Sequence, residues 1–94
     1  MGYRWIAAAL AALAPGIEPA EVLQVLRAAH RLPVPGSAAG VRVLAIFART
    51  DSGRPLMVLV RPDRDGLDHL IIGAREPTGE ELAMLRRWEG EQDV

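Results

Sequence analysis

The stretch LIIGAREPTGEELAMLRRWEG, Leu70 to Gly90, changes its periodicity near the middle. Up to Ala74 it has the apolar composition of a β-strand. From Thr78 onward, apolar residues recur every three or four positions, which is typical of an amphipathic helix. Thr78 and Glu81 also match a capping box, in which each side chain accepts a hydrogen bond from the other residue's amide. The stretch therefore predicts a strand that ends at Ala74 and a helix that begins at Thr78.

A charged pair, Arg75 and Glu76, lies where this strand gives way to the helix. One interpretation is structural: Arg75 pairs with Glu76 or Asp68 and anchors the start of the helix. The other is functional: Arg75 lies at the edge of a sheet and binds an anion through charge-assisted hydrogen bonds, with Glu76 as its resting partner. We predict the second arrangement.

Two further strands precede this one. The segments VRVLAIFAR (Val41–Arg49) and PLMVLVR (Pro55–Arg61) flank a TDSG turn, and a PDRDG turn leads into the third strand, Leu67–Ala74. Three strands joined by short turns predict an antiparallel meander. Both parities of the first two strands are largely apolar, so both faces of the sheet need cover. We therefore expect a homodimer or a tight hetero-complex.

Two helices are expected before the strands, at Tyr3–Ala14 and Pro19–His30. The segment RLPVPGSAAG (Arg31–Gly40) is rich in proline and glycine and is predicted to be a connection too short to separate domains. The chain is thus expected to be one α+β domain over residues 1–94. It contains two N-terminal helices, a three-stranded antiparallel meander and a C-terminal helix, with an acidic frayed tail from about residue 90.

Composition limits the possible functions. Half of the 94 residues are apolar (50%) and 24% are charged, so the chain is of the globular class. The absence of cysteine excludes disulfides and thiolate metal sites, and two histidines, His30 and His69, are too few for a zinc site. We expect no metal and no cofactor. The formal net charge of −1 is too low for a protein that coats nucleic acid non-specifically, although local contact with RNA is compatible with it.

The N-terminal segment MGYRWIAAALAALAPG has the composition of a secretory signal. Its basic region is only Arg4, and Pro15 would follow the cleavage site, so an amphipathic helix is the better interpretation. The apolar run is also far shorter than the roughly 20 residues that a membrane span needs. A cytoplasmic location without membrane contact is expected.

Three motifs follow one another along the chain: R-T-x-x-G-R-P-L over residues 49–56, A-R-E-x-T-x-x-E over 74–81, and R-R-W-E over 86–89. In this order and spacing they resemble the BrnT family, the toxins of type II toxin–antitoxin pairs, whose fold is related to that of RelE-type ribonucleases. The early YRW is similar to the aromatic-x-Trp that opens many BrnT-like chains. The resemblance covers about residues 16–89.

The resemblance implies endoribonuclease activity on cellular RNA and a partner that neutralises it, a ribbon–helix–helix antitoxin of the BrnA type. Arg49 matches the arginine before the first hairpin turn, Arg75 matches the Ala-Arg arginine, and Trp88 lies where many members carry an aromatic residue. The chain departs from many members at residues 14–16, where APG replaces K-H-G. A non-catalytic protein-binding or dimerisation module with the same fold is therefore the alternative.

RNA cleavage by attack of the 2′-hydroxyl needs a base, an acid and positive charge near the developing phosphorane. Without a cluster of metal ligands, such an enzyme has to be metal-free. Arg49 and Arg75, each at a strand end, are the predicted phosphate stabilisers. His69 has the same parity as Arg75 on the third strand and is the predicted acid or base, with Glu76 as a second candidate base. A half-exposed strand histidine without a catalytic role is the alternative for His69.

Overall fold

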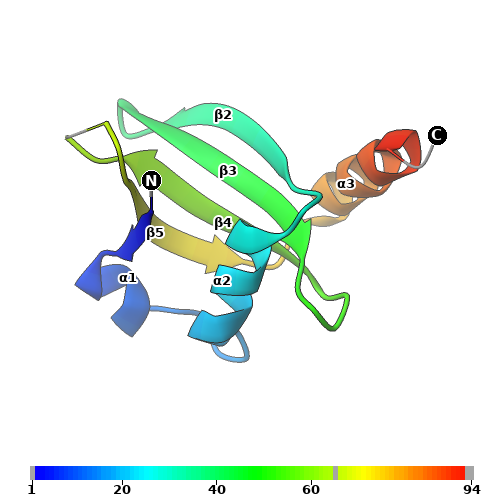
Figure 1. The fold of residues 1–94 in the computed structure, drawn as a ribbon, viewed down its shortest axis with the longest axis horizontal. Coiled ribbons are helices and arrows are strands. Elements are labelled where there is room, and N and C mark those ends of the chain that lie inside the picture. Colours follow the sequence, from blue (N-terminus) through cyan, green and yellow to red (C-terminus); the bar gives the residue numbers. More distant parts are fainter. Residues whose placement is uncertain (1, 65, 93–94) are drawn as a thin grey trace.

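The computed structural model describes residues 2–64 and 66–92, and its centre is a five-stranded sheet with helices on both sides (Figure 1). The elements in chain order are β1 (Tyr3–Trp5), α1 (Ala7–Ala11), α2 (Pro19–Arg27), β2 (Leu32–Ala38), β3 (Val41–Arg49), β4 (Pro55–Pro62), β5 (His69–Arg75) and α3 (Gly79–Gln92). The expected α+β class, with N-terminal helices, a meander and a C-terminal helix, is confirmed. The expected three strands are five.

The order of strands across the sheet is β1-β5-β4-β3-β2. The predicted meander forms its centre, because β3, β4 and β5 pair antiparallel. The bounds of β3 agree with the prediction, and those of β4 and β5 differ from it by one or two residues. The two additional strands lie at the edges: β2 pairs antiparallel with β3, and β1 pairs parallel with β5.

The predicted first helix is wrong over its first turn. Tyr3–Trp5 is a strand, and the helix covers only Ala7–Ala11. The reason is the open edge of β5: the His69 amide donates to the Gly2 carbonyl at 2.9 Å, and the Ile6 amide donates to the Ile71 carbonyl at 3.2 Å. Satisfying these backbone groups outweighs the weak helical periodicity of the segment.

The segment predicted to be a connection contains the strand β2. Pro33 and Pro35 are compatible with a strand here because β2 lies at the edge of the sheet, where proline is tolerated. The two prolines are two residues apart, so their nitrogens face the same side of the strand, away from β3. The hairpin then turns through Ala39 and Gly40, both with positive φ (51° and 79°), which is the backbone of a type I′ turn.

The two faces of the sheet bury different clusters. On the α2 face, Val22, Val25 and Leu26 of α2 pack over sheet residues that include Ile46 and Val58. On the opposite side, the α3 face, Leu85 of α3 packs with Phe47 and Met57. Figure 1 shows α2 lying across the sheet and α3 extending from one end of it. The apolar side chains on both parities of β3 and β4 are therefore covered to different degrees.

An irregularity in β5 decides which side chains share a face. Leu59 of β4 lies opposite Gly73, but the next residue, Val60, lies opposite Ile71, so Ile72 is an extra residue, a β-bulge. A one-residue shift in register moves the following side chains to the other face. Residues 69 and 71 consequently lie on the α2 face, and residues 73 and 75 lie on the α3 face.

The helix α3 begins as predicted. The Thr78 amide donates to Glu81 Oε1 at 2.9 Å, and the Glu81 amide donates to Thr78 Oγ1 at 3.2 Å, which is the reciprocal pair of a capping box. The helix continues to Gln92, so the tail expected to fray from about residue 90 is helical up to that point, and residues 93–94 lie outside the described part. Among the described residues, no helix is long and apolar enough to cross a membrane.

Replacing the cap tests this start. Thr78→Ala is expected to lower the free energy of unfolding by about 0.5–2 kcal/mol, because the Glu81 amide loses its acceptor. Thr78→Ser, which keeps the hydroxyl, is the matched control and should stay close to the wild type. Urea denaturation measures both. Equal losses in the two variants would mean that the hydroxyl does not cap α3.

Candidate functional site

Arg49 and Arg75 lie at the same end of the sheet. β3 and β5 are each antiparallel to β4, so they run in the same direction and their last residues lie at the same end of the sheet. Arg75 lies opposite Met57, whose side chain is on the α3 face, and Arg49 follows Phe47 by two residues on that same face. Two strand spacings, about 10 Å, separate their backbones. The two arginines thus reach the same end of the sheet on the same face, but their guanidinium groups pair with carboxylates about two helical turns apart on α3.

Carboxylates of α3 occupy both guanidinium groups. Arg49 donates from Nε to Glu89 Oε2 at 2.8 Å and from Nη2 to Glu89 Oε1 at 3.0 Å. Arg75 donates from Nη1 and Nη2 to the two oxygens of Glu81, at 2.6 and 3.0 Å. Both pairs are bidentate, the strongest geometry for an arginine and a carboxylate. The two arginines hold α3 near its first turn and near its end.

The pKa values of these carboxyl groups reflect the pairing. The hydrogen bond from Arg75, and after it the bond from the Thr78 amide, lower the pKa of Glu81 to about 2. The hydrogen bond from Arg49 likewise lowers the pKa of Glu89. Both carboxylates are consequently charged at neutral pH and neutralise the arginines that were predicted to hold a phosphate.

Glu76 is not the carboxylate partner of Arg75, contrary to the prediction. Only its backbone carbonyl accepts from Arg75, at 3.1 Å. Its side chain pairs with Arg54 at 2.9 Å, and Arg54 also contacts Glu21 of α2 at 3.1 Å. Arg54 therefore links the start of α2 to the segment between β5 and α3. This places Glu76 in a structural ion pair rather than beside an imidazole.

His69 lies away from the other three predicted site residues. It is the first residue of β5 and Arg75 is the last, which separates them by about 20 Å along the strand. The bulge at Ile72 also puts them on opposite faces of the sheet. The parity argument was wrong because it assumed a regular strand. Arg49, His69, Arg75 and Glu76 do not form one site.

The structure gives His69 other neighbours. It pairs with Tyr3 of β1 on one side and with Pro62 of β4 on the other, and the rings of Tyr3 and His69 lie 5.9 Å apart between centroids. Beyond Pro62 lies Arg42 of β3, and the side chain of Arg42 is on the α2 face, like that of Leu44. Arg42, Pro62 and His69 line a common hollow of about 240 Å³. We call Tyr3, Arg42 and His69 together the Tyr3–Arg42–His69 row.

The row differs electrostatically from the opposite end of the sheet. Arg42 is exposed, and within residues 2–64 and 66–92 neither Arg42 nor His69 forms an ion pair. The nearby acids Asp63 and Asp68 instead pair with Arg4. An imidazole and a guanidinium are thus available to an anion at this end.

Tyr3 and Arg42 were missed at the level of the sequence. Tyr3 was assigned to a helix, and the alignment of Arg42 with His69 depends on the registers of three strands. The one available signal is that Arg42 and Arg49 are seven residues apart on one strand, so they lie on opposite faces.

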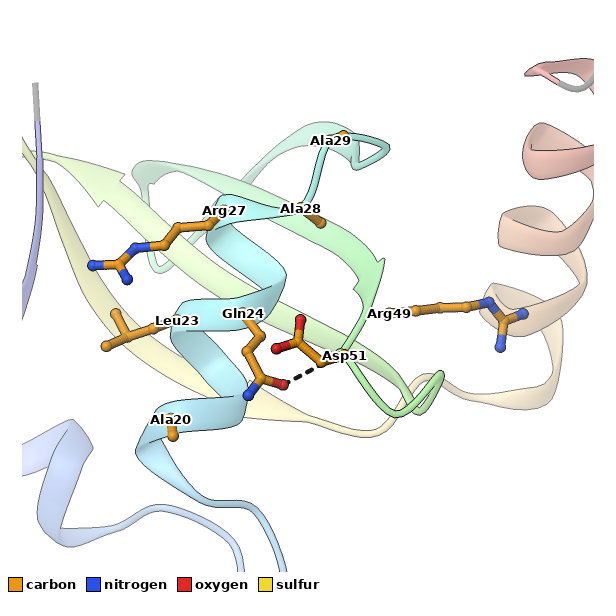
Figure 2. Close-up of a pocket in the computed structure, with 8 residues that line it drawn as sticks. All are labelled: Ala20, Leu23, Gln24, Arg27, Ala28, Ala29, Arg49 and Asp51. Atoms are coloured by element: carbon orange, nitrogen blue, oxygen red, sulfur yellow. Dashed lines mark hydrogen bonds between the residues drawn. The ribbon is translucent and has the colours of Figure 1, made fainter.

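A wider hollow lies beside α2 and is shown in Figure 2. It measures about 540 Å³, and Gln24 and Arg27 of α2 line it together with Asp51 of the hairpin turn. Arg49 borders this hollow, but its guanidinium points away toward α3, and Gln24 Oε1 already accepts from the Asp51 amide at 3.0 Å (Figure 2). The hollow therefore contains no convergent polar site. Among the described residues there is also no group of three or more potential metal ligands.

The ion pair between Arg75 and Glu81 predicts an acid dependence of stability. The pKa of Glu81 is about 2 in the folded chain and ordinarily 4.5, so its stabilising contribution is complete above pH 4.5 and is lost as the pH falls toward 2. Glu81→Gln retains an acceptor for the Thr78 amide but removes the charge. This variant should be less stable at pH 7 and lose less stability on acidification than the wild type.

Urea denaturation at several pH values measures this dependence. Glu80→Gln, a change at the exposed neighbouring carboxylate, is the matched control and should retain the acid dependence of the wild type. An unchanged acid dependence in Glu81→Gln would contradict the assignment.

Comparison with models of known protein families finds no family that matches the chain, and comparison with curated proteins finds no match either. The resemblance to the BrnT family rests on the quoted motifs, their order and their spacing.

Proposed function

We propose that the chain is a BrnT-like toxin that cleaves cellular RNA without a metal ion, and that the reacting phosphodiester lies at the Tyr3–Arg42–His69 row. The observation that supports this most is that His69 and Arg42 line one hollow at the same end of the sheet, with the Tyr3 ring beside the imidazole, and that neither forms an ion pair with a described residue. These are the groups that metal-free phosphodiester cleavage uses.

Each side chain has a role in this proposal. The 2′-hydroxyl attacks phosphorus and loses its proton to a base, the P–O5′ bond breaks, and the leaving oxygen receives a proton from an acid. The products are a 2′,3′-cyclic phosphate and a free 5′-hydroxyl. His69 is the base that accepts the proton of the 2′-hydroxyl or the acid that protonates the leaving oxygen, since an imidazole can do either near neutral pH. Arg42 binds the non-bridging oxygens with its planar fork. Tyr3 orients the imidazole or donates to the phosphate.

Arg49 and Arg75 have a different role here from the predicted one. Each is occupied by a carboxylate of α3, so in this proposal they hold the helix and do not contact RNA. Glu76, which pairs with Arg54, likewise stays outside the reaction. The proposed partner, as the BrnT resemblance implies, is a small ribbon–helix–helix antitoxin of the BrnA type.

A second candidate is a non-catalytic binding module with the BrnT-like fold. The specific observation in its favour is that the two arginines matched to the family's motifs, Arg49 and Arg75, are both neutralised within the chain. The APG sequence at residues 14–16, where many members have K-H-G, agrees with a loss of chemistry.

Cleavage of a structured cellular RNA by the purified chain in the presence of a metal chelator separates the two candidates. His69→Ala is expected to reduce the cleavage rate by about 10²–10⁴-fold, the usual contribution of a general acid or base. Arg42→Ala should also reduce it, because the phosphorane loses its cation. His30→Ala is the matched control, since His30 is exposed and lies outside the row.

Growth of cells that express each variant gives a second readout, with arrest expected for the wild type and for His30→Ala only. Thermal melts confirm that all variants fold. If the wild type neither cleaves RNA nor arrests growth, the binding module replaces the ribonuclease. If His69→Ala retains full cleavage, the row is not the active site.

A further inference from the structure

The α3 face of the sheet is covered over one end only. There Leu85 of α3 packs on Phe47 and Met57. Toward the turn between β2 and β3, the same face continues as an apolar strip, and no other described helix packs on this side, because α1 and α2 contact the sheet from the α2 face. The strip consists of Val34, Val41, Val43, Ala45 and Leu59, which are half-buried or, in the case of Val41, 46% exposed.

An unpaired arginine borders this strip. Arg61 follows Leu59 by two residues on β4, so its side chain lies on the α3 face, opposite Leu70 of β5. Arg61 is half-buried, and within the described part of the chain it forms no ion pair and no side-chain hydrogen bond. Arg4, on the same face beyond Leu70, is paired with Asp63. A partly desolvated cation without a counter-charge favours a ligand that brings a carboxylate.

The helix α3 shows which chemistry this face accepts. Leu82, Leu85 and Trp88 form its apolar seam, and Glu81 and Glu89 beside the seam pair with arginines of the sheet. The open part of the face offers the same two features, an apolar floor and an arginine at its border. A second helix of similar character fits it.

Two other occupants are disfavoured. A second copy of the chain packed face to face about a twofold axis would add a second Arg61 and a second Arg4 to the interface. The carboxylates beside this face that could pair with them are already paired within each chain. A strand added at the β2 edge would meet Pro33 and Pro35, whose outward nitrogens cannot donate.

We propose that the open part of the α3 face binds an amphipathic helix of a partner protein, whose apolar seam packs on the strip and whose carboxylate pairs with Arg61. The inference does not depend on the cleavage chemistry, because the α2 face carries the Tyr3–Arg42–His69 row. It adds the chemistry of the partner's contact segment, and it stands or falls separately from ribonuclease activity.

A peptide with the sequence of Thr78–Gln92, capped at both ends and fluorescently labelled, is the probe for the whole chain. Saturable binding with a stoichiometry of one is expected by fluorescence anisotropy. Arg61→Glu should weaken binding by at least about tenfold, since an attraction becomes a repulsion. Arg27→Glu, an equal charge reversal at an exposed arginine of α2, is the matched control and should leave binding unchanged.

Exchanging the charges between the peptide and Arg61 tests whether the peptide binds beside Arg61 or replaces the chain's own α3. A peptide with lysine in place of Glu81 and Glu89 should bind weakly to the wild type and recover affinity for Arg61→Glu. Absence of saturable binding, or binding that ignores the charge of Arg61, overturns the proposal. Light scattering that shows the wild type alone to be a dimer, dissociated by Val41→Asp, would assign the strip to a second copy and also overturn it.

Discussion

The β3–β4 hairpin carries apolar side chains on both of its faces, and the rest of the fold follows from the need to remove both faces from water. Val58 and Val60 point to one side, where they are completely buried in a cluster with residues of α2 and of the N-terminal segment. Phe47 and Met57 point to the other, where α3 supplies one fully buried residue, Leu85. Cover is thus complete on the α2 face over the centre of the sheet and incomplete on the α3 face, which leaves the strip open.

Arginine–carboxylate pairs compensate for the small apolar contact of α3. Glu81 and Glu89 reach Arg75 and Arg49 at the strand ends, and Arg54 joins α2 to the segment before α3. A bidentate fork adds orientation as well as energy, which suits a helix that extends from the sheet rather than lying across it (Figure 1). The consequence for function is a division between the two ends of the sheet. The arginines at one end hold helices, whereas at the other end Arg42 and His69 pair with no carboxylate of residues 2–64 and 66–92.

The parts of this fold that local chemistry determines could be predicted from the sequence. The capping box at Thr78, the apolar run of Val41–Arg49 before the TDSG turn and the apolar stripe of α2 are local signals, and each element is present. The edge strands could not be predicted, because β1 and β2 form where neighbouring strands leave backbone groups unpaired. The candidate site failed for a different reason: Gly73 inside the strand is a local signal of a bulge, and the assumption of a regular strand ignored it. The bulge at Ile72 puts His69 and Arg75 on opposite faces.

The most direct test of this division is where a phosphodiester binds on the folded chain. A 2′-deoxydinucleotide, which cannot be cleaved, can be titrated into isotope-labelled protein and followed by NMR at both the imidazole and the guanidinium signals. We predict salt-dependent shifts at Tyr3, Arg42 and His69, with the signals of Arg49 and Arg75 unchanged. Shifts centred on Arg49 and Arg75, with release of Glu81 and Glu89, would contradict the division and restore the arrangement first predicted from the sequence.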